Sequence, residues 1–278
     1  MQNFQGLQQR RSDHPFFRDL PAGGRWVAAH RGAALLWPEN TLPAFERSLD
    51  RGVHILEMDA RLTADGIPVI MHDETVDRTT DGTGRVREYS FAELRRLNAG
   101  WRWEKPDQPG VTPWRGKGCV IPSLEEVFQA FPGARIVLEI KEKDSALVLS
   151  VGELVQKYAR HNLTMVASFY SPVLKIFRSR FSGVATSAGR SEVFLFWLAE
   201  KLRLEKIISP CYEALQVPER FRGIQVVTAG FVRAALRRGL SVHVWTVNDP
   251  RDMARFFDMG VDAVITDAPD RAPMPGQK

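Results

Sequence analysis

Short apolar runs and helical patterns alternate along most of the chain. Nine of these runs, rich in apolar and β-branched residues and bounded by turn residues, are typical of buried strands. The strand candidates are 26–31, 54–60, 67–72, 134–141, 164–169, 183–188, 206–212, 241–247 and 261–266. The helix candidates are 41–51, 123–131, 145–160, 171–179, 191–205, 228–238 and 249–258. Strands that alternate with helices in this way predict a parallel sheet.

The number of repeats narrows the fold class. About eight repeats over roughly 250 residues predict an α/β protein with a distorted (β/α)8 TIM barrel. Nine strand candidates compete for the eight barrel positions, and the pattern leaves open which one is surplus. Capping residues support the helices. The predicted N-caps are Thr41, Ser123 and Asn248, and the glycines expected at helix C-terminal ends are Gly52, Gly239 and Gly260.

The regular pattern has one long interruption. Residues 74–122 form a predicted insertion after the third strand, and its tryptophans (Trp101, Trp103 and Trp114) argue against disorder. We expect it to cap the C-terminal face of the barrel; a subdomain packed on the barrel's side is the alternative. The other predicted boundaries are an N-terminal lead-in at 1–25, the barrel at 26–270 and a C-terminal tail at 271–278.

Composition and charge exclude some functions. The 278 residues are 44% hydrophobic and 26% charged, which is ordinary for a globular protein. The net charge of +5 is spread along the chain, which favours an anionic substrate or surface over a dedicated nucleic-acid site. The chain contains no apolar run of transmembrane length and no signal-peptide pattern. We therefore expect a cytoplasmic protein; peripheral contact with a membrane surface and the oligomeric state are left open.

Carboxylates lie near the C-terminal ends of two predicted strands. Glu57 and Asp59 are two residues apart, so they point to the same face of a strand, and the same holds for Glu139 and Lys141. Carboxylates on a buried strand are costly unless they are paired or bound to a cation. Glu57, Asp59 and Glu139 are therefore predicted ligands of one divalent cation, Mg²⁺ or Ca²⁺. The alternative is that each carboxylate pairs with an Arg or Lys of the barrel.

Two histidines also stand at strand ends. His30 and His72 each end an apolar run and precede a polar turn. Because the C-terminal ends of barrel strands meet on one face, we expect these histidines to lie near the carboxylates. Side chains with a pKa near neutrality suit proton transfer at a phosphodiester. Dinucleotide, P-loop, nucleophile-elbow and zinc-protease motifs are missing from the sequence.

These residues belong to a set of ordered motifs. The motifs are HRG…PENT (30–41), ExD…DG…VIMHD…DRTT (57–80), IPSLEEVF (121–128), LEIK (138–141), SF (168–169), VWTVND (244–249) and GVDAVITDAP (260–269). Together they resemble the glycerophosphodiester phosphodiesterase family over nearly the whole chain. The resemblance implies a distorted barrel similar to that of phosphatidylinositol-specific phospholipase C.

The resemblance also implies roles for individual residues. His30 and His72 would form the acid–base pair, and Glu57, Asp59 and Glu139 would bind the metal. The substrate-binding residues would be Arg31 and Lys141 on the phosphate, and Phe169 and Trp245 on the glycerol or the group beyond it. Glu39 and Asn40 would support the site. Two positions depart from the family pattern: Asn98 replaces a common Asp, and the bulky Trp37 is expected to narrow or line the mouth.

The resemblance implies a hydrolase of lipid and glycerol metabolism that acts on a small-molecule phosphodiester. It would cleave glycerophosphodiesters to sn-glycerol 3-phosphate and an alcohol. The alternative is a lysophospholipase D that releases lysophosphatidic acid, with the apolar stretch 191–202 meeting acyl chains; a helix packed on the barrel would also explain that stretch. A barrel that only binds phosphodiesters is disfavoured because no His or carboxylate is lost. The nucleophile, water or the substrate's 2-hydroxyl, and the order of the two histidines are left open.

Overall fold

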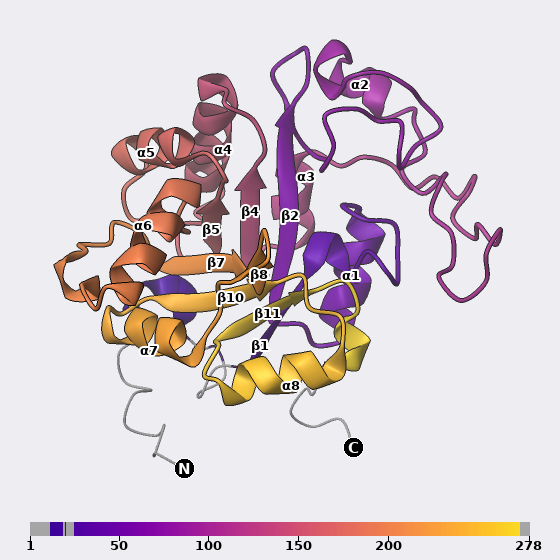
Figure 1. Ribbon diagram of the computed structural model, residues 1–278. Helices are drawn as coiled ribbons and strands as arrows, with labels where there is room; N and C mark the ends of the chain where they lie inside the picture. The colour runs from indigo at the N-terminus through magenta and orange to yellow at the C-terminus, as the bar shows by residue number, and fades with distance from the viewer. Residues whose placement is uncertain (1–11, 19, 21–24, 273–278) are drawn as a thin grey trace.

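The computed structural model describes residues 12–18, 20 and 25–272, most of which form a barrel of eight parallel strands surrounded by helices (Figure 1). The barrel strands are β1 (Trp26–Ala29), β2 (Ile55–Leu62), β4 (Ile136–Ile140), β5 (Thr164–Ala167), β6 (Ala185–Thr186), β7 (Ala214–Pro218), β10 (Ser241–Trp245) and β11 (Ala263–Thr266). They follow one another in the order β6-β5-β4-β2-β1-β11-β10-β7. A bridge between Ser187 and Ala214 joins the two ends of this order. The predicted TIM barrel is confirmed.

The surplus strand is the third candidate. Strand β3 (Pro68–Ile70) pairs antiparallel with the end of β2, with Arg61 opposite Val69. The link between the two strands is short and turns at Gly66, whose φ of 78° suits glycine. A link of this length allows a hairpin but no parallel crossover. The third candidate is therefore a hairpin arm and occupies no position in the barrel.

The strand predicted at 206–212 is wrong. This segment includes the end of a short 3-10 helix, η5 (Glu205–Ile207), and the barrel strand β7 begins only at Ala214. In β7 the apolar Leu215 and Val217 face the helices, whereas Gln216 between them faces the barrel interior. Gln216 interrupts the apolar run of β7. The apolar stretch at 206–212 was therefore predicted as the strand instead.

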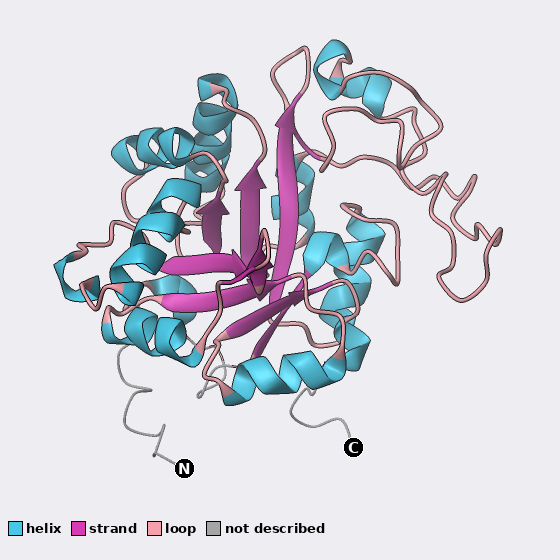
Figure 2. Ribbon diagram, viewed as in Figure 1, coloured by secondary structure: helices cyan, strands magenta, loops and turns pink. Residues whose placement is uncertain are grey.

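Seven helices surround the barrel (Figure 2), and each overlaps a predicted helix. They are α1 (Leu42–Asp50), α3 (Leu124–Ala130), α4 (Ser145–Lys157), α5 (Ser171–Arg180), α6 (Arg190–Lys201), α7 (Ala229–Arg237) and α8 (Pro250–Asp258). The N-caps Thr41 and Ser123 are confirmed. Asn248 is not the cap of α8, because Asp249 accepts the hydrogen bonds of the first turn. The glycines Gly52, Gly239 and Gly260 follow the helix ends with positive φ, as expected.

Barrel side chains alternate between two apolar layers. In β1, Val27 packs towards the helices, whereas Trp26 and Ala28 belong to a second cluster inside the barrel. That inner cluster also contains Phe16 and Phe17 of the 3-10 helix η2 (Pro15–Phe17). Part of the predicted lead-in therefore closes the N-terminal end of the barrel; residues 1–11, 19 and 21–24 lie outside the described chain.

The segment 74–122 has a small core of its own. It contains the 3-10 helix η4 (Val86–Glu88) and the short helix α2 (Phe91–Leu94). The Trp103 indole donates a hydrogen bond of 3.0 Å to the Ala34 carbonyl, and Arg47 of α1 lies over the Trp114 ring. These contacts join the segment to the turn after β1 and to α1, while the cap and the side-packed subdomain both stay predictions.

Three smaller features complete the fold. A hairpin of β8 (Arg220–Phe221) and β9 (Ile224–Gln225) follows β7, and the 3-10 helix η6 (Pro269–Arg271) follows β11. The 3-10 turn η3 (His30–Gly32) follows β1. Among the residues that the structure describes, no helix combines the length and apolar character needed to cross a membrane.

Candidate active site

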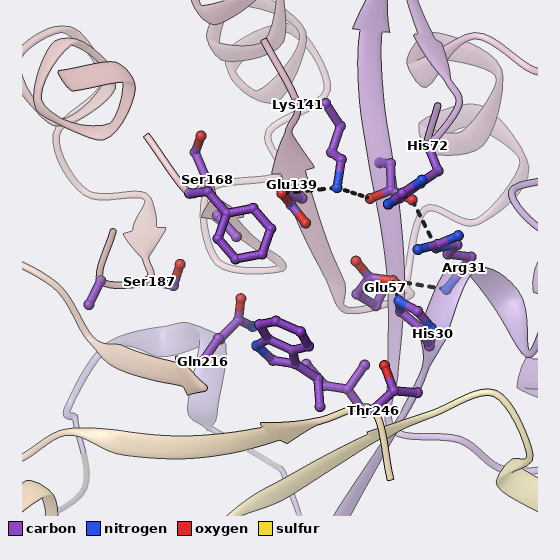
Figure 3. Close-up of a pocket in the computed structure, with 16 residues that line it drawn as sticks. His30, Arg31, Glu57, His72, Glu139, Lys141, Ser168, Ser187, Gln216 and Thr246 are labelled. Atoms are coloured by element: carbon purple, nitrogen blue, oxygen red, sulfur yellow. Dashed lines mark hydrogen bonds and ion pairs between the residues drawn. The ribbon is translucent and has the colours of Figure 1, made fainter. Parts of the chain in front are cut away.

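Along β1, β2 and β4 the inward-facing residues change from apolar to titratable or charged. Near the strand starts they include Ala28, Ile55 and Val137, whereas His30, Glu57 and Glu139 lie nearer the strand ends. The charged ends line a cavity of about 140 Å³ (Figure 3). All of the predicted site residues line it: His30, Arg31, Glu57, Asp59, His72, Glu139, Lys141, Phe169 and Trp245. The structure thus brings them together, while their chemical roles stay predictions.

Three carboxylates form the acidic part of the cavity. Asp59 and Glu139 are register partners on β2 and β4, and Glu57 lies two residues before Asp59. One oxygen from each of the three lies within 4.8 Å of the others. Burial and the neighbouring Asp59 raise the pKa of Glu57 to about 7, and burial also raises the pKa of Glu139. Burial and the closeness of the other carboxylates thus disfavour the ionised forms of Glu57 and Glu139.

Two cations partly neutralise the carboxylates. Lys141 Nζ lies 3.1 Å from Glu139 Oε1 and 3.4 Å from Asp59 Oδ1. Arg31 Nε lies 3.5 Å from Asp59 Oδ2. Burial alone would raise the pKa of Asp59, but Lys141 and Arg31 outweigh it and the pKa is lowered. The predicted pairing with barrel Arg and Lys residues is therefore present for Asp59 and Glu139, whereas Glu57 instead accepts a hydrogen bond from Arg31 N and lies 4.0 Å from His30 Nε2.

His30 is held by a carboxylate from the last barrel strand. Its Nδ1 lies 2.6 Å from Asp267 Oδ1, and its Nε2 lies 4.0 Å from Glu57 Oε2. Burial alone would lower the pKa of His30, but Glu57 and Asp267 outweigh it and raise the pKa. Asn248 donates a hydrogen bond of 3.0 Å to Asp267 and so fixes that carboxylate.

His72 has a similar partner but an opposite shift. Its Nδ1 lies 2.6 Å from Asp73 Oδ1. Burial lowers the pKa of His72, and the cations Arg31 and Lys141 add to this effect. Despite partial burial, hydrogen bonds from Arg78 and His72 lower the pKa of Asp73 to about 2. The pKa values of the two histidines are therefore shifted in opposite directions within the same cavity.

The HRG and PENT motifs shape the end of β1. Arg31 and Asn40 have positive φ values of 51° and 57°, which are uncommon for residues with a side chain. At Gly32, an added Cβ would lie 2.8 Å from the Phe45 ring. The turn places the Arg31 amide 2.8 Å from Glu57 Oε2, and Asn40 Nδ2 lies 2.9 Å from Asp59 Oδ2.

Glu39 supports the site as expected. It accepts a hydrogen bond of 3.1 Å from Arg31 and two from Arg78. Trp37, by contrast, does not line the mouth. It is buried in the core and lies under Arg51, because the turn directs its ring towards α1.

A second, apolar cavity of about 880 Å³ opens beside the first. The two cavities share lining residues, namely Phe169, Ala188, Gln216 and Trp245. The rings of Phe169 and Trp245 meet edge-on with centroids 5.7 Å apart. Neither cavity is lined by a residue of 74–122.

Helix α6 forms one wall of the apolar cavity. Phe196 is fully buried, as expected for a helix packed on the barrel, but Phe194 is 61% exposed and lines the cavity with Trp197. One face of the helix is therefore packed on the barrel as expected, and contact of the exposed face with acyl chains stays a prediction.

A comparison with protein families decides the assignment. The model of the "Glycerophosphoryl diester phosphodiesterase family" matches residues 30–271. The chain belongs to this family. A glycerophosphodiester phosphodiesterase from Caldanaerobacter subterraneus subsp. tengcongensis is 32% identical over 88% of this chain and 94% of its own length. The resemblance found in the sequence is thus confirmed, and the protein is a phosphodiester hydrolase.

Two further relatives differ in what they act on or bind. An Oleispira antarctica phosphodiesterase, solved with the product sn-glycerol-3-phosphate, is 26% identical with a TM-score of 0.73; the match covers 89% of this chain and 95% of that one. Lysophospholipase D GDPD1 from Homo sapiens is 26% identical over 87% of this chain and 83% of its own length.

Sequence reasoning missed one residue that lines the cavity, Gln216, and two that contact residues of the site, Asp267 and Arg78. Asp267 directly follows β11, so the strand-end rule that found His30 could also have found it. Gln216 was missed because its strand was misplaced. Arg78 gave no signal, since only the folded chain brings it to Glu39. Asn98 lies away from the cavity, where its side chain accepts a hydrogen bond from Gly100 N.

Proposed function

We propose that the protein hydrolyses glycerophosphodiesters to sn-glycerol 3-phosphate and a free alcohol, by metal-dependent acid–base catalysis. The observation that carries the proposal is the meeting of His30, His72 and the three carboxylates around one small cavity. The product complex of the Oleispira antarctica relative supports a small-molecule substrate of this kind.

The donor set fits a hard divalent cation. Glu57, Asp59 and Glu139 offer only oxygen atoms, which suit Mg²⁺ or Ca²⁺. When bound, such a cation supplies positive charge to the phosphate oxygens. It would also offset the burial and the repulsion by Asp59 that together raise the pKa of Glu57 to about 7.

Arg31 and Lys141 are the phosphate-binding residues in this proposal. Both line the cavity and carry donors that here contact carboxylates. A bound phosphate diester would accept charge-assisted hydrogen bonds from them. Binding would thereby orient the phosphorus between the two histidines.

The two histidines move the protons. The ionised Asp267 and Asp73 accept from Nδ1 of His30 and His72, which leaves each Nε2 as the nitrogen for the reaction. One imidazole takes a proton from the nucleophile, and the other gives a proton to the leaving alcohol oxygen. The opposite pKa shifts of the two rings suit this division of labour.

A chelation experiment tests this function. The purified protein is treated with EDTA and then assayed for glycerol 3-phosphate release from glycerophosphoethanolamine, with Mg²⁺ or Ca²⁺ added back. We expect activity only with a divalent cation. Undiminished turnover in EDTA would refute metal dependence, and no turnover with either cation would refute the substrate class.

A second candidate function follows from the apolar cavity. Its volume of about 880 Å³ and its shared residues Phe169 and Trp245 provide room for an acyl chain next to the phosphodiester site. The protein would then act as a lysophospholipase D that releases lysophosphatidic acid. A side-by-side assay of glycerophosphoethanolamine and lysophosphatidylethanolamine at equal concentration decides between the two. Preference for the lysolipid would favour the second candidate.

A further inference from the structure

One face of α6 is apolar and exposed. Phe194, Leu195, Leu198 and Leu202 are exposed by 61%, 54%, 37% and 59%. Phe194, Leu198 and Leu202 are spaced by four residues, so they follow one line along the helix surface and its C-terminal end. The opposite face is packed, with Phe196 fully buried against Phe231 of α7. The helix is therefore anchored by its packed face, and its outer face stays exposed.

The β8–β9 hairpin continues this apolar surface. Phe221 and Ile224 are 47% and 52% exposed, and both line the apolar cavity together with Phe194. We use the name apolar rim for these six residues: Phe194, Leu195, Leu198, Leu202, Phe221 and Ile224. The rim therefore borders the cavity that continues to the phosphodiester site.

The charged residues that line the apolar cavity have one sign. Lys143, Arg190 and Arg222 line the cavity, and no Asp or Glu does. None of the three cations has a carboxylate oxygen within 4.0 Å in the described part of the chain. Lys143 and Arg222 instead lie over the rings of Tyr170 and Phe221. An apolar surface with unneutralised cations complements the interface of an anionic bilayer.

We propose that the apolar rim docks on the surface of an anionic phospholipid bilayer, with the mouth of the apolar cavity facing the lipids. The unpaired cations select an anionic surface, and the continuity of rim and cavity favours lipids over a folded protein partner. A single-chain lipid could then pass from the bilayer into the cavity without exposing its chain to water. The proposal goes beyond hydrolysis, and docking is measured without turnover.

Vesicle binding tests the proposal. The full chain is sedimented with vesicles of equal parts phosphatidylglycerol and phosphatidylcholine, and with vesicles of phosphatidylcholine alone. Because three cations face the lipids, we expect at least about tenfold stronger binding to the anionic vesicles, weakening as salt is added. The proposal would be overturned if the protein bound both kinds of vesicle equally, or if it did not bind the anionic vesicles.

A pair of matched variants locates the binding surface. The double variant Leu195→Ser/Leu202→Ser removes exposed rim residues that line neither cavity, and we expect it to weaken vesicle binding by about tenfold. The control Val111→Ser/Leu149→Ser removes residues exposed by 43% and 37% elsewhere, and should bind as the parent does. Turnover of glycerophosphoethanolamine shows that both variants are folded. Undiminished vesicle binding by the rim variant would overturn the proposal.

Sedimentation equilibrium tests whether a second copy of the chain covers the apolar rim. If the parent chain is a dimer and the rim variant a monomer, a second copy covers the rim and the docking proposal fails. If vesicle binding behaves as expected but no diester is hydrolysed, docking stands and the proposed function fails.

Discussion

The two adjoining cavities are built from different parts of the fold. The polar cavity of about 140 Å³ is lined mainly by strand ends, and its charged groups hold one another in place. The apolar cavity of about 880 Å³ is walled by α6 and the β8–β9 hairpin, and its three cations have no carboxylate partner among the described residues. Under the proposed function, the strand ends would determine the bond that is broken, while helices and loops would determine what may be attached to it.

Removing either histidine should have the largest effect. We expect His30→Ala and His72→Ala each to lower kcat for glycerophosphoethanolamine by roughly 100-fold or more, because one proton transfer is lost. Steady-state assays at saturating cation measure this. His161→Ala, which changes a histidine outside both cavities, is the control. A wild-type rate in either active-site variant would remove the chemistry from the polar cavity.

Changing one of the three carboxylates should weaken binding of the divalent cation. We expect Glu139→Gln to raise the Mg²⁺ concentration needed for half-maximal activity by at least about tenfold, since one charged ligand is lost. Isothermal titration with Mg²⁺ measures affinity without turnover. Glu153→Gln, at an exposed position of α4, should leave it unchanged. Equal affinity in Glu139→Gln and the parent would favour simple pairing of Glu139 with Lys141.

The Asp267–His30 contact should set a pH dependence. Because Asp267 raises the pKa of His30, Asp267→Asn should lower that pKa and reduce kcat/KM by roughly 10- to 100-fold. One limb of the pH profile should then move to lower pH. Movement of the acid limb identifies His30 as the base, and movement of the alkaline limb identifies it as the acid.

The matched variant Asp73→Asn should leave the NMR titration of His30 unchanged, because Asp73 contacts His72 instead. A His30 titration that stays constant in Asp267→Asn would contradict the assignment of Asp267 as its positioning partner.

Substitutions in the apolar cavity should have the smallest effect, and this effect should be largely confined to the lysolipid substrate. We expect Phe221→Ser/Ile224→Ser to raise KM for lysophosphatidylethanolamine about five- to tenfold, because part of the acyl contact is lost. Turnover of glycerophosphoethanolamine should stay within about twofold. Val111→Ser, outside both cavities, is the control. Equal losses on both substrates would show that the two cavities are not separable in function.

Regular patterns made much of the barrel and its chemistry predictable. The spacing of Glu57 and Asp59 places both inside the barrel, because alternate residues of a strand share a face. His30 was found because polar residues that end barrel strands meet at one end of the barrel. His72 was found by the same rule, but it reaches the cavity from the antiparallel hairpin arm β3, where Ile70 pairs with Ala60 of β2. Helices were located by the same kind of local periodicity, with Thr41 and Ser123 as their caps.

Features without a local pattern could not be found in this way. Gln216 interrupts the apolar run of β7, so its strand was misplaced. Phe16 and Phe17 lie in a polar lead-in and gave no sign that they close the barrel. Strand β3 resembles a barrel strand in sequence, since both are short and apolar, although β3 pairs antiparallel with β2.

By itself, the sequence determined the barrel, its seven surrounding helices and the titratable residues that line the polar cavity, because strand and helix periods are local properties of the chain. Only the tertiary structure decided that Asp267 holds His30, that Arg78 reaches Glu39, and that one face of α6 stays exposed beside an apolar cavity. These features join residues far apart in the chain. Which side chains meet, and which stay uncovered, depends on how the finished helices and strands pack.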